Sequence, residues 1–186
     1  MANDIKLQEG HPVDENLRPI KVGGESTSLE VALENARIKG NCEVTGSIST
    51  NEIKSNSDYT RFNTSVGFDI ITATYDATNT AVDFRLGNKY IMTFGSGNIT
   101  NLVLTFPAVS GNFVLLLKQD GTGSRTISNY KVFDFAGNVA TAAGVKFPSG
   151  TAPDLTDAAN HVDIVSIFWD ATNGIAYGVA TLDFQD

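Results

Sequence analysis

Metal binding and nucleophilic catalysis would have to rely on two histidines and one cysteine in this chain of 186 residues. His11 lies in a polar stretch, and Cys42 has no histidine near it in the sequence. His161 precedes an apolar run, with Asp163 two positions further on. Because a zinc site needs three or four ligands, we interpret His161 as a histidine at a strand end and Cys42 as a small apolar side chain. The sequence therefore predicts neither a metal site nor a catalytic site.

Two acidic segments could bind calcium, namely residues 154–157 and the pair Asp69 and Asp76. Neither has the regular spacing of oxygen ligands that a calcium loop requires. The glycine-containing residues 120–123 lack the following helix and the Lys-Ser/Thr pair of a phosphate-binding loop. The nucleophile-elbow and zinc-protease motifs are also absent from the sequence. We therefore expect a protein that is not an enzyme and that needs no cofactor.

Three aromatic side chains, Tyr59, Tyr130 and Trp169, could stack on sugar rings if they were exposed. Trp169 ends an apolar run, which favours its burial. Tyr59 and Tyr130 remain candidates for aromatic side chains that face a ligand. They keep a carbohydrate-binding receptor module open as the alternative function, whereas burial of Trp169 and Tyr177 would favour a purely structural role.

The charge and hydropathy of the chain restrict its partners. A net charge of −8 argues against nucleic acid, because neutralising phosphates requires a surplus of Lys and Arg. No apolar stretch approaches the roughly 20 residues of a membrane-spanning helix. Residues 1–10 are polar and lack the apolar segment of a secretory signal.

The composition predicts an all-β fold. Glycine is frequent, and Thr, Ser, Asn, Val, Ile and Phe dominate the second half of the chain. Short apolar runs separated by Asn, Asp and Gly turns are typical of a β-sandwich or jelly roll. We expect a domain over residues 57–186 with strands at 68–75, 81–86, 89–94, 99–106, 113–117, 132–135, 162–169 and 175–184. Residues 136–144 are rich in Gly and Ala and are interpreted as a loop.

Alternation in two of these strands predicts which side chains face the core. In the run 81–86 the inward residues would be Val82, Phe84 and Leu86, since they share one face of a strand. In the run 99–106 the shared face holds Leu102, Leu104 and Phe106.

We expect residues 114–127 to be the stretch around which the domain is organised. An apolar run without alternation ends at Lys118, residues 120–123 read Asp-Gly-Thr-Gly, and the chain continues to Ile127. Such a run is typical of a strand buried on both faces, although a short helix has the same hydropathy. Because Asp-Gly supplies the positive φ angles of a tight turn, we predict a β-hairpin here.

A second hairpin is predicted at residues 162–184, with its turn at 170–174. The second strand contains Ile175, Val179, Leu182 and Phe184, which is too apolar for a loose tail. We expect this strand to pair within the sheet and to contribute to the core. If the Phe184 ring is fully buried, Phe184→Ala should cost about 3 kcal/mol.

The first third of the chain differs from the rest in its composition and in its lack of long apolar runs. Residues 1–35 contain Pro12 and Pro19 and no long periodic pattern, so we interpret them as an extended arm with short strands at 18–22 and 29–33. A single helical turn is the alternative at 29–33. In residues 36–56, isolated aliphatic residues stand beside glycine or small residues, among them Ile38, Val44 and Ile48. These three side chains could meet their copies on a common axis and form a trimeric β neck, or the segment could be an ordinary meander with tight turns.

Several segments resemble virion proteins of tailed bacteriophages, especially marine ones. Residues 4–32 resemble the start of such virion structural proteins, and residues 38–48 resemble the short β elements that join a fibre anchor to its head. A domain that recurs in phage fibres and appendages is similar over residues 99–107, 119–126 (Gln-Asp-Gly-Thr-Gly-Ser-Arg-Thr), 146–153 (Lys-Phe-Pro-Ser-Gly-Thr-Ala-Pro) and 160–164.

The resemblance implies a non-catalytic homotrimer on the virion surface. Its partners would be its own copies and other capsid or tail proteins, the latter bound through residues 1–35, and host surface glycans would be further partners under the alternative function. Because the shaft-like part is limited to residues 36–56, a short capsid fibre or a decoration protein fits the length as well as a tail fibre does.

Overall fold

The computed structural model describes residues 6–7, 16, 18–22, 25–31, 36–38, 44 and 66–185. The chain separates into two compact units, residues 1–61 and residues 62–186. In the described residues almost all regular structure is β, as the sequence predicted. No helix in that part of the chain is both long and apolar enough to cross a membrane.

The N-terminal unit contains a four-stranded antiparallel sheet. Its strands lie in sequence order and are β1 (Lys6–Leu7), β2 (Arg18–Val22), β3 (Glu25–Val31) and β4 (Ala36–Ile38). The strand predicted at 18–22 is β2, and β3 shows that the segment beginning at Leu29 is a strand rather than a helical turn. Across β3 and β4, Arg37 Nε donates to the buried Glu30 carboxylate at 2.8 Å.

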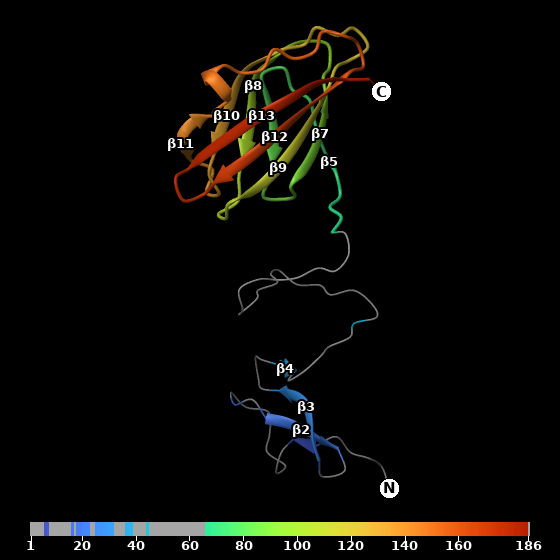
Figure 1. Cartoon of the computed structure of the whole chain (residues 1–186), viewed down its shortest axis with the longest axis vertical. Coiled ribbons are helices and arrows are strands. Elements are labelled where there is room, and N and C mark those ends of the chain that lie inside the picture. The colour runs from blue at the N-terminus through green and yellow to red at the C-terminus, as the bar shows by residue number, and fades with distance from the viewer. Residues whose placement is uncertain are drawn as a thin grey trace. The chain divides into compact units, whose positions relative to one another are not determined.

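The C-terminal unit is a sandwich of two sheets (Figure 1). One sheet has the order β11-β10-β8-β6 and the other has the order β13-β12-β9-β7-β5. The strands are β5 (Ile71–Ala73), β6 (Asn79–Asp83), β7 (Lys89–Thr93), β8 (Ile99–Thr105), β9 (Gly111–Lys118), β10 (Ile127–Phe133), β11 (Val139–Gly144), β12 (Val162–Asp170) and β13 (Ile175–Phe184). Residues 136–144, which were predicted to be a loop, contain β11, in which Ala140 and Ala142 alternate with exposed residues and are buried.

From β5 to β10 the chain alternates between the two sheets and does not form a series of hairpins. Each of these strands joins the sheet opposite to that of the strand before it. Strands two apart in sequence are therefore neighbours and run parallel, namely β5 with β7, β7 with β9, β6 with β8 and β8 with β10. Within the C-terminal unit, the antiparallel pairs all involve β11, β12 or β13.

The hairpin predicted at residues 114–127 is therefore wrong. β9 pairs with β7 and β12, whereas β10 pairs with β8 and β11 in the other sheet. The turn between them bridges the thickness of the sandwich. Gln119 links the two sides of this turn, since its side chain donates to Arg125 O and accepts from Arg125 N, both at 2.9 Å. The turn residues were identified correctly, but a turn sequence does not reveal which sheet receives the next strand.

The core is formed by the inward side chains of both sheets. Leu102, Leu104 and Phe106 are all fully buried, as their alternation predicted. Val82 and Phe84 are buried too, but Leu86 is 73% exposed, because β6 ends at Asp83 and the chain then turns. The prediction for Leu86 is therefore wrong.

The central strand of the larger sheet is β9, but it is not buried on both faces. Phe113, Leu115 and Leu117 face the core, while Val114 and Leu116 are only half-buried on the other side. The apolar run without alternation thus reflects a sheet with apolar side chains on both of its faces.

The closing hairpin is confirmed, with β12 and β13 antiparallel from Val162–Phe184 to Asp170–Ile175. Its contribution to the core is smaller than predicted. Ala176 is buried, but Val179 is 54% exposed, Leu182 39% and Phe184 42%. The apolar character of β13 therefore belongs largely to the outside of the sheet.

Candidate functional site

The outward side of the five-stranded sheet carries several exposed apolar side chains, among them Phe168, Tyr177 and Val179. We call it the outer sheet face. It consists of the outward side chains of β13, β12, β9 and β7, which are Tyr177, Val179, Thr181, Phe184, Val162, Ile164, Ser166, Phe168, Asn112, Val114, Leu116, Lys118, Lys89, Ile91 and Thr93. Surfaces of this kind usually mark a contact with another molecule.

Register brings the apolar members of this face together across strands. Tyr177 lies opposite Phe168, and each is 47% exposed. In the next row, Ser166 lies between Val179 and Val114. A hollow of about 410 Å³ opens around these five side chains, because Ser166 is the smallest of them.

Formal charges on the outer sheet face are few and are separated. Its lysines, Lys89 and Lys118, lie on β7 and β9. The nearby acidic residues lie at opposite ends of the closing hairpin, since Asp170 pairs with Ile175 and Asp183 is next to Phe184, which is in register with Val162 and Lys118. Lys89 lies in register with Val114, next to the row of Val179 and Ser166.

The opposite sheet presents a polar exterior. Asn79, Asn101 and Asn129 lie in register on three parallel strands. Asn101 Nδ2 donates to Asn79 Oδ1 at 3.0 Å, and Asn129 Nδ2 donates to Asn101 Oδ1 at 3.4 Å. Such ladders stabilise parallel strands. The sequence analysis missed this ladder, because its spacings of 22 and 28 residues do not repeat.

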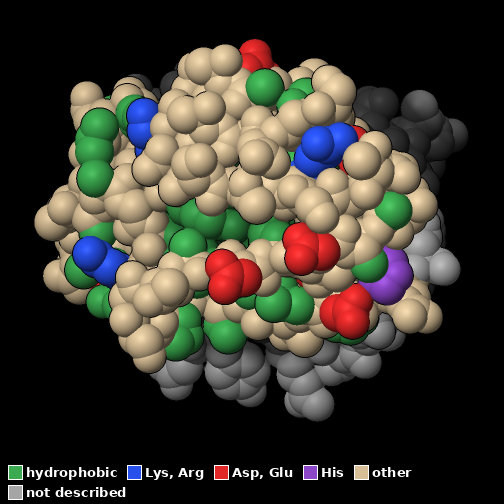
Figure 2. Space-filling model, turned by 90° about the horizontal axis from the view of Figure 1, so that it is seen from above, with side chains coloured by type: hydrophobic (Ala, Val, Ile, Leu, Met, Phe, Trp, Pro, Cys, Tyr) green, Lys and Arg blue, Asp and Glu red, His purple; other side chains and the backbone are tan. Residues whose placement is uncertain are grey.

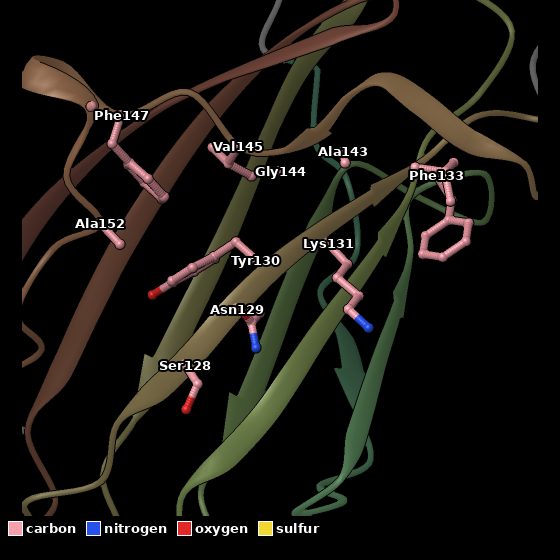
Figure 3. A pocket seen from close by; sticks show the side chains of 12 residues that line it. Ser128, Asn129, Tyr130, Lys131, Phe133, Ala143, Gly144, Val145, Phe147 and Ala152 are labelled. Carbon is pink, nitrogen blue, oxygen red and sulfur yellow. The ribbon is translucent and has the colours of Figure 1, made fainter.

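A pocket of about 540 Å³ lies beside β10 and β11 (Figure 3). Apolar and aromatic side chains make up most of its wall, including Tyr130, Phe133, Val145 and Phe147. Lys131 is its one charged lining residue. In Figure 3, Tyr130 extends toward Phe147 and Ala152, whereas Lys131 and Phe133 extend to the other side of β10. A pocket of this size and composition could hold a small ligand that has an apolar face and polar edges.

Tyr130, a predicted ligand-facing aromatic residue, lines this pocket but is only 7% exposed. Its ring meets Phe147 edge to face at 5.1 Å. Its hydroxyl is buried without a hydrogen-bond partner in the described structure. Burial, assisted by the Asp163 carboxylate, raises the pKa of the Tyr130 hydroxyl, which therefore remains protonated. Because that oxygen is shielded from solvent, a ligand in the pocket meets the ring and not the hydroxyl.

The predicted strand-end histidine has an acidic neighbour on the last strand. His161 Nδ1 lies 2.6 Å from Asp183 Oδ1. Asp163 is buried and accepts hydrogen bonds from Thr156 N at 2.8 Å, Thr156 Oγ1 at 2.6 Å and Asp183 N at 3.0 Å. Its carboxylate thus ties the closing hairpin to the preceding loop. Figure 2, which views the structure from above, shows acidic side chains gathered beside a histidine.

Within the described residues, no three His, Cys, Asp or Glu side chains are grouped as a metal site would require. In one of the two predicted acidic segments, Asp76 Oδ1 instead accepts from Thr78 N at 2.7 Å and Asn79 N at 2.9 Å. These bonds lower the pKa of Asp76, the bond from Asn79 being the larger cause. The carboxylate therefore stabilises its own turn.

The remaining predicted residues are placed as follows. Trp169 is buried, stacks on Phe106 with ring centroids 4.8 Å apart and donates from Nε1 to Pro107 O at 2.9 Å, so its predicted burial is confirmed. Of the neck residues, Ile38 is 44% exposed and Val44 is 46% exposed. Ile48 and Tyr59 lie outside the described residues, as do His11 and Cys42.

Comparisons with family models, with curated proteins and with solved structures found no match to this chain.

Proposed function

We propose that this protein is a non-enzymatic structural component of a tailed-phage virion, displayed on the particle surface as a homotrimer. It would serve as a short fibre or as a capsid decoration protein. The resemblance of residues 4–32, 38–48 and 99–164 to phage virion proteins supports this proposal. The β-sandwich agrees with it, since the resembling segments include strands and turns of that sandwich.

The observation that supports an assembling protein best is the outer sheet face. Phe168, Tyr177 and Val179 are each about half exposed on one copy of the chain, next to half-buried Val114 and Leu116. Each half-exposed aromatic ring leaves on the order of 100 Å² of surface in water. Covering apolar surface stabilises a complex by about 25 cal/mol per Å² before the costs of association. A protein that functions within an assembly gains this energy, whereas a solitary domain does not.

In this proposal the N-terminal residues 1–35 attach the protein to the particle. A variant without these residues should remain folded and trimeric but should no longer bind virions. Co-sedimentation of tagged full-length and shortened protein with particles that lack the native protein would test this expectation. Equal binding by the two forms would contradict the role of residues 1–35.

The virion location itself is tested by mass spectrometry of purified particles from the phage that encodes this sequence. We expect peptides of this protein at a stoichiometry that is a multiple of three per particle. Its absence from particles that are complete and infectious would refute the proposed function.

The pocket beside β10 favours carbohydrate binding as a second candidate function, because it is wide enough for a sugar and has an aromatic wall. Glycan-array binding by the full chain, repeated with Tyr130→Leu, would test it. The candidate requires glycan binding that the substitution weakens. The absence of binding by the unaltered chain would leave the structural function alone.

A further inference from the structure

We infer that the pocket beside β10 binds a saccharide that carries a carboxylate, and that Lys131 is the residue that selects the negative charge. This inference rests on carbohydrate binding, the second candidate function. It adds the chemical class of the saccharide and the side chain that distinguishes this class from neutral sugars.

The pocket exists because β11 leaves β10 partway along its length. β8 pairs with β10 from one end to the other, whereas β11 pairs with it only at Lys131 and Phe133. Beyond Gly144 the chain bonds to β10 once more, from Val145 N to Tyr130 O at 3.3 Å, and then passes to β13. In the described structure, the first half of β10 therefore borders a pocket of about 540 Å³ on this side. Sites for small molecules commonly have volumes of roughly 300–1,000 Å³.

One side of the pocket offers an apolar surface to a ring. Tyr130 and Phe147 both line it, and their rings meet edge to face at 5.1 Å. Gly144 lies opposite Lys131 across the two strands and adds no side chain to the space between them. A sugar ring combines an apolar face with hydroxyl groups at its edge, so a wall of this kind suits it.

The other side of β10 offers polar atoms that no other described residue uses. Asn129 and Lys131 are exposed and share the outward side of the strand. Asn129 bonds within its ladder through Nδ2, which leaves Oδ1 as an acceptor for a hydroxyl group. Lys131 forms no ion pair with any described residue. Since Figure 3 shows Tyr130 on one side of β10 and Lys131 on the other, a ligand seated on the edge of this strand can contact both.

The charge of the pocket is opposite in sign to that of the chain. The chain has a net charge of −8, but Lys131 is the one charged residue in the pocket wall. Two acidic side chains near this end of β10 are already engaged, since Asp83 Oδ2 accepts from Arg85 Nη2 at 2.6 Å and Asp134 Oδ1 accepts from Asn138 N at 2.8 Å. A carboxylate on the sugar would give Lys131 a charge-assisted hydrogen bond, which a neutral sugar cannot provide.

Saturation-transfer difference NMR of the full chain would test this inference with digalacturonate and galactobiose, α-1,4-linked disaccharides that differ in the carboxylate or hydroxymethyl group at C6. We expect tighter binding of digalacturonate. Lys131→Gln should weaken that binding about fivefold, at the upper end for an exposed ion pair, and should leave galactobiose binding unchanged. Lys131→Glu should weaken it further. Lys146→Gln is the matched control, because Lys146 is also exposed but does not line the pocket.

Equal affinity for the two disaccharides, or a preference for digalacturonate that survives Lys131→Gln, would overturn the inference. Equally effective displacement of digalacturonate by inorganic phosphate at the same ionic strength would overturn it too, because the pocket would then bind anions without recognising the sugar. Binding of galactobiose alone overturns this inference and retains the carbohydrate-binding candidate, whereas binding of neither disaccharide overturns both. The virion function is tested separately, by the composition of the particles.

Discussion

Gly123→Ala should be one of the most damaging single-methyl changes in the C-terminal unit. Gly123 has a φ of 79°, where a side chain is disfavoured. A β-carbon there would lie 2.2 Å from Asp157 O and 2.8 Å from Ala159 N, both of which are backbone atoms. The turn after β9 therefore fits against residues 157–159 only when this position has no side chain.

The magnitude follows from what the displaced backbone would lose. A left-handed residue other than glycine costs about 1 kcal/mol. Moving the two segments apart would also weaken the bonds from Ser124 N to Asp157 O at 2.8 Å and from Asn160 N to Asp120 O at 3.1 Å. Each such bond contributes about 1 kcal/mol. The expected loss of unfolding free energy is about 3 kcal/mol, equivalent to roughly 10 °C in melting temperature for a unit of this size.

Gly121→Ala is the matched control in the same turn. A β-carbon at Gly121 would have no neighbour within 4 Å, and its φ is not positive. Thermal and urea unfolding of the two variants should therefore separate them clearly. Melting temperatures within about 2 °C of each other would refute the argument that close docking of this turn stabilises the sandwich.

Three further predictions concern stability. Asn101→Ala removes the centre of the asparagine ladder and should cost about 1–2 kcal/mol in urea unfolding, and an unchanged midpoint would show that the ladder is incidental. Trp169→Ala should cost about 4 kcal/mol, but Phe184→Ala less than half as much in the dissociated protein, since the ring of Phe184 is 42% exposed; equal losses would contradict the structure of β13. The hydrogen bond from Arg125, opposed in part by desolvation and aided by backbone bonds, lowers the pKa of Asp120 below its value in the unfolded chain. Its stabilising effect should therefore be complete above about pH 5 and decline as the pH falls below about 4. The melting temperature of Asp120→Asn should fall less steeply there, and parallel curves would refute this role.

The sequence was informative about strands and core positions, because alternation within one strand depends only on local geometry. Leu102, Leu104 and Phe106 illustrate this, since all three are buried as predicted. Alternation stops being informative where a strand ends, which is why Leu86 was wrongly placed inside.

The connections between strands could not be predicted in the same way. An Asp-Gly-Thr-Gly turn can close a hairpin within one sheet or cross between two sheets, and the difference lies in distant contacts such as Gly123 with residues 157–159. The asparagine ladder and the outer sheet face depend on which strands become neighbours, so they emerge only with the topology. For the same reason, the apolar residues of β13 were assigned to the core rather than to an exposed face.

A cryo-electron microscopy map of the whole virion would test the central claim most directly. We expect density for three copies of this chain around a common axis at the particle surface. Particles without this protein, or copies that stand singly, would contradict the claim.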